Sequence, residues 1–212
     1  MDPIRIHVAG AWDSMLTSGV LAGLVGVEGI ELVGLDLDRM DPARLRANAP
    51  DLLISAGHRY LIAPAEIAVP RLGTVGLHPA LLPRYRGSHP LWWALHNHET
   101  EAGITLYRLD AGIDTGPIVA QRVVPIVPGD TFRSLYRRTV KEIPSILAEL
   151  QAAIAETGEL PAGTVQDEAL ATYFGPPSER QLRGSLLGRI GRRAGRSIRS
   201  IGSAVRGAPA RR

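Results

Sequence analysis

The chain has 212 residues, of which 45% are hydrophobic and 21% charged, a balance typical of a globular protein with one sizeable core. It contains no cysteine, which excludes disulfides and thiolate sites for a metal or for nucleophilic attack. The net charge is +3, but residues 183–212 carry nine arginines and no acidic residue, which leaves −6 for residues 1–182. The pI of 9.7 therefore reflects the C-terminal segment, and we expect no nucleic-acid partner for the body of the chain.

Strand and helix patterns alternate along the first half of the chain. Residues 15–27 are apolar but follow Asp13 without a basic segment, which favours a buried first helix over a signal peptide. No stretch is long enough to span a bilayer, and together with the lack of cysteine this favours a cytoplasmic protein. Strands are predicted over 4–10, 30–36, 51–56, 69–78, 102–109 and 117–127, and helices over 13–25, 42–48, 90–98 and 131–157.

The order of these elements predicts an α/β fold with a Rossmann-like, mixed but mostly parallel sheet flanked by helices. Asp130 is placed to cap the last helix, and Pro144 should kink or split it. Ligands of such sheets bind at the carboxyl ends of the strands. We divide the chain into a catalytic domain over 1–180 and an arginine-rich tail over 181–212.

A histidine lies at one of these predicted strand ends. The run His78-Pro-Ala-Leu-Leu-Pro-Arg-Tyr-Arg-Gly87 holds it on a loop that Pro79 and Pro83 stiffen. A second loop, Asp110-Ala-Gly-Ile-Asp114-Thr-Gly-Pro117, offers a carboxylate on a glycine-rich backbone that can approach a ligand closely. A histidine and an aspartate brought together are the minimum equipment for moving a proton at neutral pH. Taken alone, each segment could also be an ordinary turn.

Together, the two segments resemble the signature of the 10-formyltetrahydrofolate-dependent formyltransferases. That signature pairs an Asn-x-His-Pro-Ser-Leu-Leu-Pro-like run with a later Asp-Thr-Gly, and the similarity covers roughly residues 51–163. The resemblance implies the formyltransferase fold, 10-formyltetrahydrofolate as formyl donor, His78 as catalytic histidine and Asp114 as the aspartate that orients it. It also implies a folate pocket between two backbone walls, formed by Tyr60, Leu61 and Ile62 on one side and by Ala111, Gly112 and Ile113 on the other.

The chain departs from the signature at Gly76, where the family usually has asparagine. Loss of one hydrogen-bond donor to a developing oxyanion costs on the order of 10²–10³ in rate. Three alternatives follow. Charged His78 could stabilise the oxyanion alone, or another donor could take the place of the asparagine, with His89 as our candidate. Alternatively, formyl transfer could be lost or replaced by hydrolysis. We favour a working formyltransferase.

The acceptor is expected to be a small primary amine, and a nucleotide-linked amino sugar is our choice. Family members that act on tRNA carry a further C-terminal domain, for which the chain offers only its arginine-rich tail, so methionyl-tRNA is the alternative. A metal-dependent hydrolase is less favoured because the histidines show no familiar ligand spacing, and we predict no metal site.

The tail has two open interpretations. Its apolar residues recur at helical spacing between arginines, as in a basic amphipathic helix that binds an anionic membrane surface, here at the inner face. Alternatively, it is a disordered solubilising segment, because four glycines weaken the helix by about 1 kcal/mol each. The sequence leaves the oligomeric state open.

Overall fold

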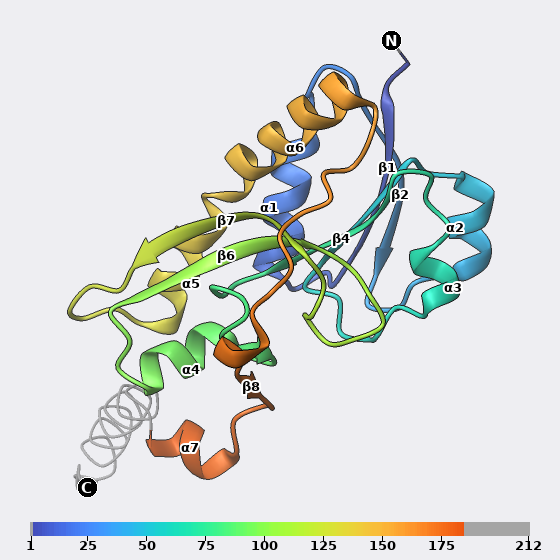
Figure 1. Ribbon diagram of the computed structural model, residues 1–212. Coiled ribbons are helices and arrows are strands. Elements are labelled where there is room, and N and C mark those ends of the chain that lie inside the picture. Colours follow the sequence, from blue (N-terminus) through green and yellow to red (C-terminus); the bar gives the residue numbers. More distant parts are fainter. Residues whose placement is uncertain (1, 185–212) are drawn as a thin grey trace, which may run out of the picture. The chain divides into compact units, whose positions relative to one another are not determined.

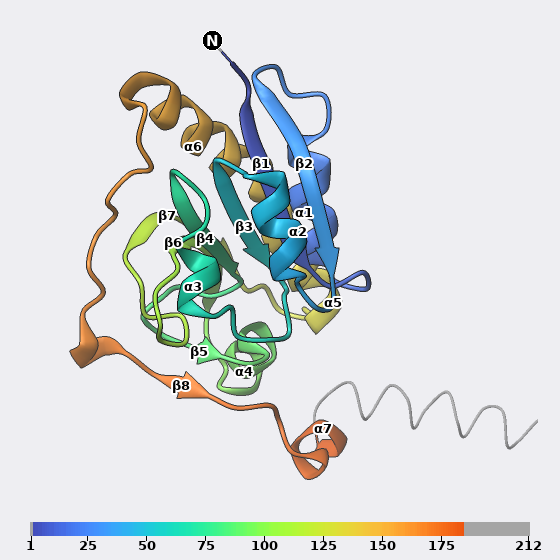
Figure 2. The ribbon, with the colours of Figure 1, turned by 90° about the vertical axis from the view of Figure 1, so that its right-hand side faces the viewer.

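A six-stranded sheet, in the order β2-β1-β3-β4-β6-β7, forms the centre of the computed structural model, which describes residues 2–184 (Figures 1 and 2). The first four strands in this order are parallel, and β6 and β7 are antiparallel to their neighbours. The predicted mixed, mostly parallel sheet is therefore confirmed. Its strands are β1 (Ile4–Gly10), β2 (Ile30–Leu37), β3 (Leu52–Ala56), β4 (Gly73–His78), β6 (Glu101–Arg108) and β7 (Ile118–Pro125).

Helices cover both faces of this sheet. On one face, α1 (Met15–Leu24) and α6 (Ile143–Thr157) pack on the strands and on each other, and α5 (Phe132–Val140) contacts α1 (Figure 1). The other face carries α2 (Pro42–Asn48) and α3 (Pro64–Ile67) over a smaller apolar cluster (Figure 2). Residues of α6 at helical spacing, namely Ile143, Ile146, Leu147, Leu150 and Ile154, are all buried in the larger core.

The long helix predicted over 131–157 is split, as the proline indicated. Pro144 lies in the first turn of α6, where its missing N–H costs no helical hydrogen bond. The prediction that Asp130 caps this helix at its N-terminus was wrong. Thr131 is the cap of α5, and its hydroxyl accepts the Ser134 N–H at 3.1 Å. Asp130 instead forms an ion pair with Arg138, in the last turn of α5.

The segment after α6 returns along the outer strand and forms a second, two-stranded sheet. Thr164 pairs with Ile118 of β7, and β8 (Tyr173–Phe174) pairs in parallel with β5 (Arg86–Gly87). A short 3-10 helix, Glu168–Leu170, lies between these pairings, and α4 (Pro90–His96) follows β5. The segment after α6 therefore joins the histidine loop by backbone pairing.

The chain forms two compact units that divide after Gly175. The sheets and the candidate site belong to the first unit, and the second contains α7 (Glu179–Gly184). Within residues 2–184, no helix is both long enough and apolar enough to cross a membrane. Most of the predicted basic tail, from residue 185 onward, lies outside the described residues, so its two interpretations and the division at residue 180 stay predictions.

Candidate active site

His78 is the last residue of β4, and both of its ring nitrogens face polar partners. Its Nε2 lies 2.7 Å from the carbonyl oxygen of Tyr85 on the following loop. Because a carbonyl oxygen can only accept, Nε2 carries a hydrogen and donates it. The other nitrogen, Nδ1, lies 3.5 Å from Oδ2 of Asp114. The side chain is only 8% exposed, so the imidazole is held in one orientation by these two neighbours.

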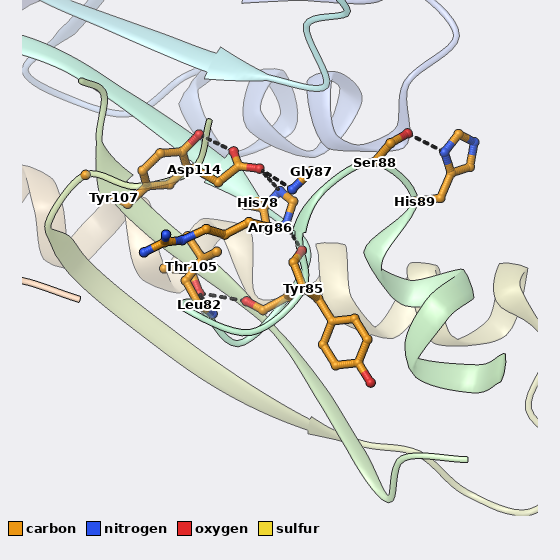
Figure 3. A network of polar contacts seen from close by, with 12 residues as sticks. His78, Leu82, Tyr85, Arg86, Gly87, Ser88, His89, Thr105, Tyr107 and Asp114 are labelled. Carbon is orange, nitrogen blue, oxygen red and sulfur yellow. Dashed lines mark hydrogen bonds and ion pairs between the residues drawn. The ribbon is translucent and has the colours of Figure 1, made fainter. Parts of the chain in front are cut away.

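Asp114 lies between His78 and Tyr107 (Figure 3). Its Oδ2 also accepts the Gly87 N–H at 2.8 Å, and its Oδ1 accepts the Tyr107 hydroxyl at 2.7 Å. The sequence had suggested that the two side chains meet because both follow strand ends. In fact β6 is antiparallel to β4, and the loop after β6 begins near Thr74, at the amino end of β4. Asp114 reaches His78 because that loop turns back along the strand.

Hydrogen bonds from a distant segment hold this loop in place. The side-chain amide of Gln166 donates to the carbonyl oxygens of Asp114 at 2.9 Å and Gly116 at 2.7 Å. Arg86 in turn donates to Gln166 Oε1 and pairs with both carboxylate oxygens of Glu168. A Cβ atom at Gly116 would lie 1.8 Å from the Arg108 carbonyl oxygen, so only glycine permits this close approach.

The His78–Asp114 pair lies in an open cleft of about 780 Å³. The cleft is lined by residues 57–62 and 109–114, which include both folate walls that the resemblance implied, and by the residues that follow β5. Leu61 is 76% exposed and Ile113 is 40% exposed. Within residues 2–184, the backbone N–H and C=O groups of Leu61, Ile62, Ala111 and Ile113 make no hydrogen bond to another part of the chain. Both segments that line the cleft therefore carry backbone donors and acceptors without a partner among the described residues.

Comparison with known sequences identifies the family of this chain. The family model for formyl transferase matches residues 38–150, more than half of the chain. The chain belongs to the formyl transferase family. The methionyl-tRNA formyltransferase of Pseudomonas putida strain GB-1 is 39% identical over 131 residues, which make up 62% of this chain and 42% of that protein. The chain therefore spans less than half the length of the curated relatives that it matches.

Solved structures of the formyl transferase family share this fold. Glycinamide ribonucleotide transformylase 1 from Symbiobacterium toebii superposes with a TM-score of 0.64 at 27% identity, over 77% of this chain and 93% of that one. The formyltransferase PseJ from Anoxybacillus kamchatkensis gives 0.60 at 25% identity, over 81% and 85%. PseJ was solved with tetrahydrofolate and UDP-4,6-dideoxy-4-formamido-L-AltNAc. These likenesses agree with the resemblance that the two sequence segments indicated.

The site residues that the resemblance implied meet at the cleft, whereas His89, our own candidate for a substitute oxyanion donor, is turned toward Ser88. His78 and Asp114 face each other, and the two predicted folate walls line the same space. His89 also lines the cleft, but it is exposed and its Nδ1 lies 2.5 Å from the Ser88 hydroxyl. Figure 3 shows its ring turned toward Ser88 and away from His78. An oxyanion role for His89 stays a prediction, and this orientation does not favour it.

Two further findings concern a possible metal site and two residues that the sequence analysis did not single out. Within residues 2–184, no three His, Asp or Glu side chains are grouped so that they could hold a metal ion. Tyr107 and Gln166 were not singled out, yet both hydrogen-bond to Asp114. Neither has a sequence signal, because Tyr107 occupies an ordinary strand position and Gln166 lies 52 residues beyond Asp114.

Proposed function

We propose that this chain transfers the formyl group of 10-formyltetrahydrofolate to the primary amine of a nucleotide-linked amino sugar. The observation that carries the proposal is the His78–Asp114 pair, with Nδ1 facing Oδ2 at 3.5 Å inside a cleft of about 780 Å³. A cleft of this size is in the usual range for small-molecule sites. Membership of the formyl transferase family supports the reaction class.

The anchoring of His78 determines which of its nitrogens can exchange a proton. Nε2 is committed to the Tyr85 carbonyl, and Nδ1 faces the carboxylate of Asp114. Nδ1, together with the Asp114 carboxylate, is therefore the site at which the pair can exchange a proton. In the proposed reaction, the acceptor nitrogen forms a bond to the formyl carbon and the bond from that carbon to the folate nitrogen breaks. The pair takes the proton that the amine loses and returns it to the leaving folate nitrogen.

The donor would bind between the two backbone walls. Free N–H and C=O groups of Leu61 and Ile62 on one side and of Ala111 and Ile113 on the other fit a flat, polar-edged ring system such as a pterin. Exposed apolar surface on Leu61 and Ile113 would be covered by the same ligand. These residues thus match the chemistry of a folate, and their role depends on backbone atoms rather than on side-chain identity.

Two observations support the proposed acceptor, an exposed aromatic residue in the cleft and the likeness to a sugar formyltransferase. Tyr173 of β8 lines the cleft and is 60% exposed, and an exposed aromatic ring suits stacking by a nucleotide base. The likeness to PseJ, whose structure holds a UDP-linked formamido sugar, also favours this acceptor class. Methionyl-tRNA is the second candidate, because relatives with that named substrate are 37–39% identical to this chain over 131 residues.

Assays with three separate acceptors test the proposal. The full chain is incubated with 10-formyltetrahydrofolate and, separately, with a UDP-linked 4-amino sugar, methionyl-tRNA or glycinamide ribonucleotide, and N-formyl products are measured by mass spectrometry. We expect formylation of the amino sugar, with a loss of about 10²–10⁴ in kcat for His78→Asn and Asp114→Asn. Formylation of methionyl-tRNA alone would reject the sugar and support the second candidate. Formate release without transfer to any acceptor would replace transferase activity by hydrolysis.

A binding measurement separates the donor site from the chemistry. Calorimetry with 5-formyltetrahydrofolate, a stable analogue of the donor, should show binding that survives His78→Ala and fails with Tyr60→Pro, which distorts the first backbone wall. Absence of binding to correctly folded wild-type protein would contradict the donor assignment, whatever the acceptor.

A further inference from the structure

The space beside Gly76 is filled by the ring of Tyr107. The two residues are paired across the antiparallel strands β4 and β6. A Cβ atom built on Gly76 would lie 2.7 Å from both Cε1 and Cζ of Tyr107 and 2.6 Å from a methyl carbon of Leu109. A real Cβ atom does not approach other atoms so closely, so a side chain at position 76 and the tyrosine ring exclude each other. The tyrosine ring in this position therefore requires a glycine at position 76.

The phenol brings a hydrogen-bond donor to the catalytic pair. Tyr107 is 8% exposed, lines the cleft, and donates its hydroxyl hydrogen to Oδ1 of Asp114 at 2.7 Å. Burial raises the pKa of the Tyr107 phenol well above its usual value, and the neighbouring Asp114 raises it further. The hydroxyl therefore keeps its hydrogen throughout the neutral pH range and can act only as a donor toward the carboxylate.

The contacts on the two oxygens of Asp114 differ in kind. Oδ2 accepts the Gly87 N–H and faces His78, whereas Oδ1 is held by Tyr107. With both oxygens fixed, the carboxylate plane cannot rotate, and Oδ2 stays directed at the imidazole. The terminal torsion of an aspartate is otherwise broad, so loss of one anchor would allow other orientations.

We propose that Tyr107 is a positioning residue of the active site, which supplies in this chain a donor that no side chain at position 76 can provide. Its hydroxyl holds the Asp114 carboxylate toward His78. Asp110 and Arg86 are the other charged groups near this cluster. This inference rests on the proposed formyl transfer, because it assigns Tyr107 a part in the same proton exchange.

The test is Tyr107→Phe, which keeps the ring that fills the space beside Gly76 and removes only the hydroxyl. We expect kcat to fall about 10- to 100-fold, as for a slightly misplaced catalytic group, with KM for the folate donor unchanged. The acid limb of the pH–rate profile should move to higher pH, because a carboxylate that loses a hydrogen-bond donor holds its proton more tightly. The matched control is Tyr136→Phe, which removes a different cleft hydroxyl, one that contacts Ser14, and should leave the acid limb in place.

A second readout does not depend on activity. In protein labelled at histidine, the ring resonances of His78 are followed by NMR between pH 4 and 9 in wild type, Tyr107→Phe and Tyr136→Phe. We expect the titration midpoint to move to lower pH in Tyr107→Phe alone, because a carboxylate that is no longer held toward the imidazole stabilises its charged form less. If wild type transfers no formyl group but this midpoint moves, the proposed function fails and the positioning role stands. If kcat, the pH–rate profile and the NMR midpoint all match wild type in Tyr107→Phe, the positioning role is overturned.

Discussion

Gly76→Ala should destabilise the fold, although alanine suits a strand better than glycine does. The added Cβ atom would meet three atoms within 2.7 Å, two of them in the Tyr107 ring and one at the end of Leu109. The Leu109 methyl can move, but the ring is buried and its hydroxyl is bonded to Asp114. Overpacking of this kind costs about 1–3 kcal/mol. For a chain of this length, each kcal/mol lowers Tm by about 2–4 °C.

Urea unfolding of wild type, Gly76→Ala and Gly175→Ala measures this cost. Gly175 is the matched control, because a Cβ atom there would meet nothing within 4 Å. In a Tyr107→Val background the ring is gone, and Gly76→Ala should then cost nearly nothing, which gives a coupling energy of about 1–3 kcal/mol between the two sites. If Gly76→Ala is as stable as Gly175→Ala in the wild-type background, the mutual exclusion of residue 76 and the tyrosine ring is refuted.

Two further outcomes are expected elsewhere in the fold. Gln166→Leu removes the donor to the carbonyl oxygens of Asp114 and Gly116, so the free energy of unfolding in urea should fall by about 1–3 kcal/mol, with a lower kcat. Unchanged stability and kcat would show that the loop holds its shape without Gln166. Arg138 holds the pKa of the Asp130 carboxyl well below its usual value. As the pH falls below about 4, Asp130 is therefore protonated in the unfolded chain before it is protonated in the folded protein, and the free energy of unfolding decreases. Asp130→Asn should therefore flatten the fall in unfolding free energy between pH 5 and 2. An identical slope in the variant would contradict this assignment.

Local patterns in the sequence determined most of the fold and indicated the two residues, His78 and Asp114, whose side chains meet in the cleft. Alternation and apolar runs located the strands, and the position of Pro144 indicated the split between α5 and α6, because proline cannot continue a helix that precedes it. The residue pattern around His78 and Asp114 was specific enough to indicate the family that comparison then identified. All of these signals are carried by residues close together in the chain.

The tertiary structure decided what depends on register between distant segments. That Tyr107 faces Gly76 follows from the pairing of β4 with β6, and a shift of one residue would turn the tyrosine to the other face of the sheet. Gln166 reaches Asp114 only because the segment after α6 returns along β7. Sequence spacing specifies which chemical groups are present, whereas long-range pairing decides which of them share one carboxylate.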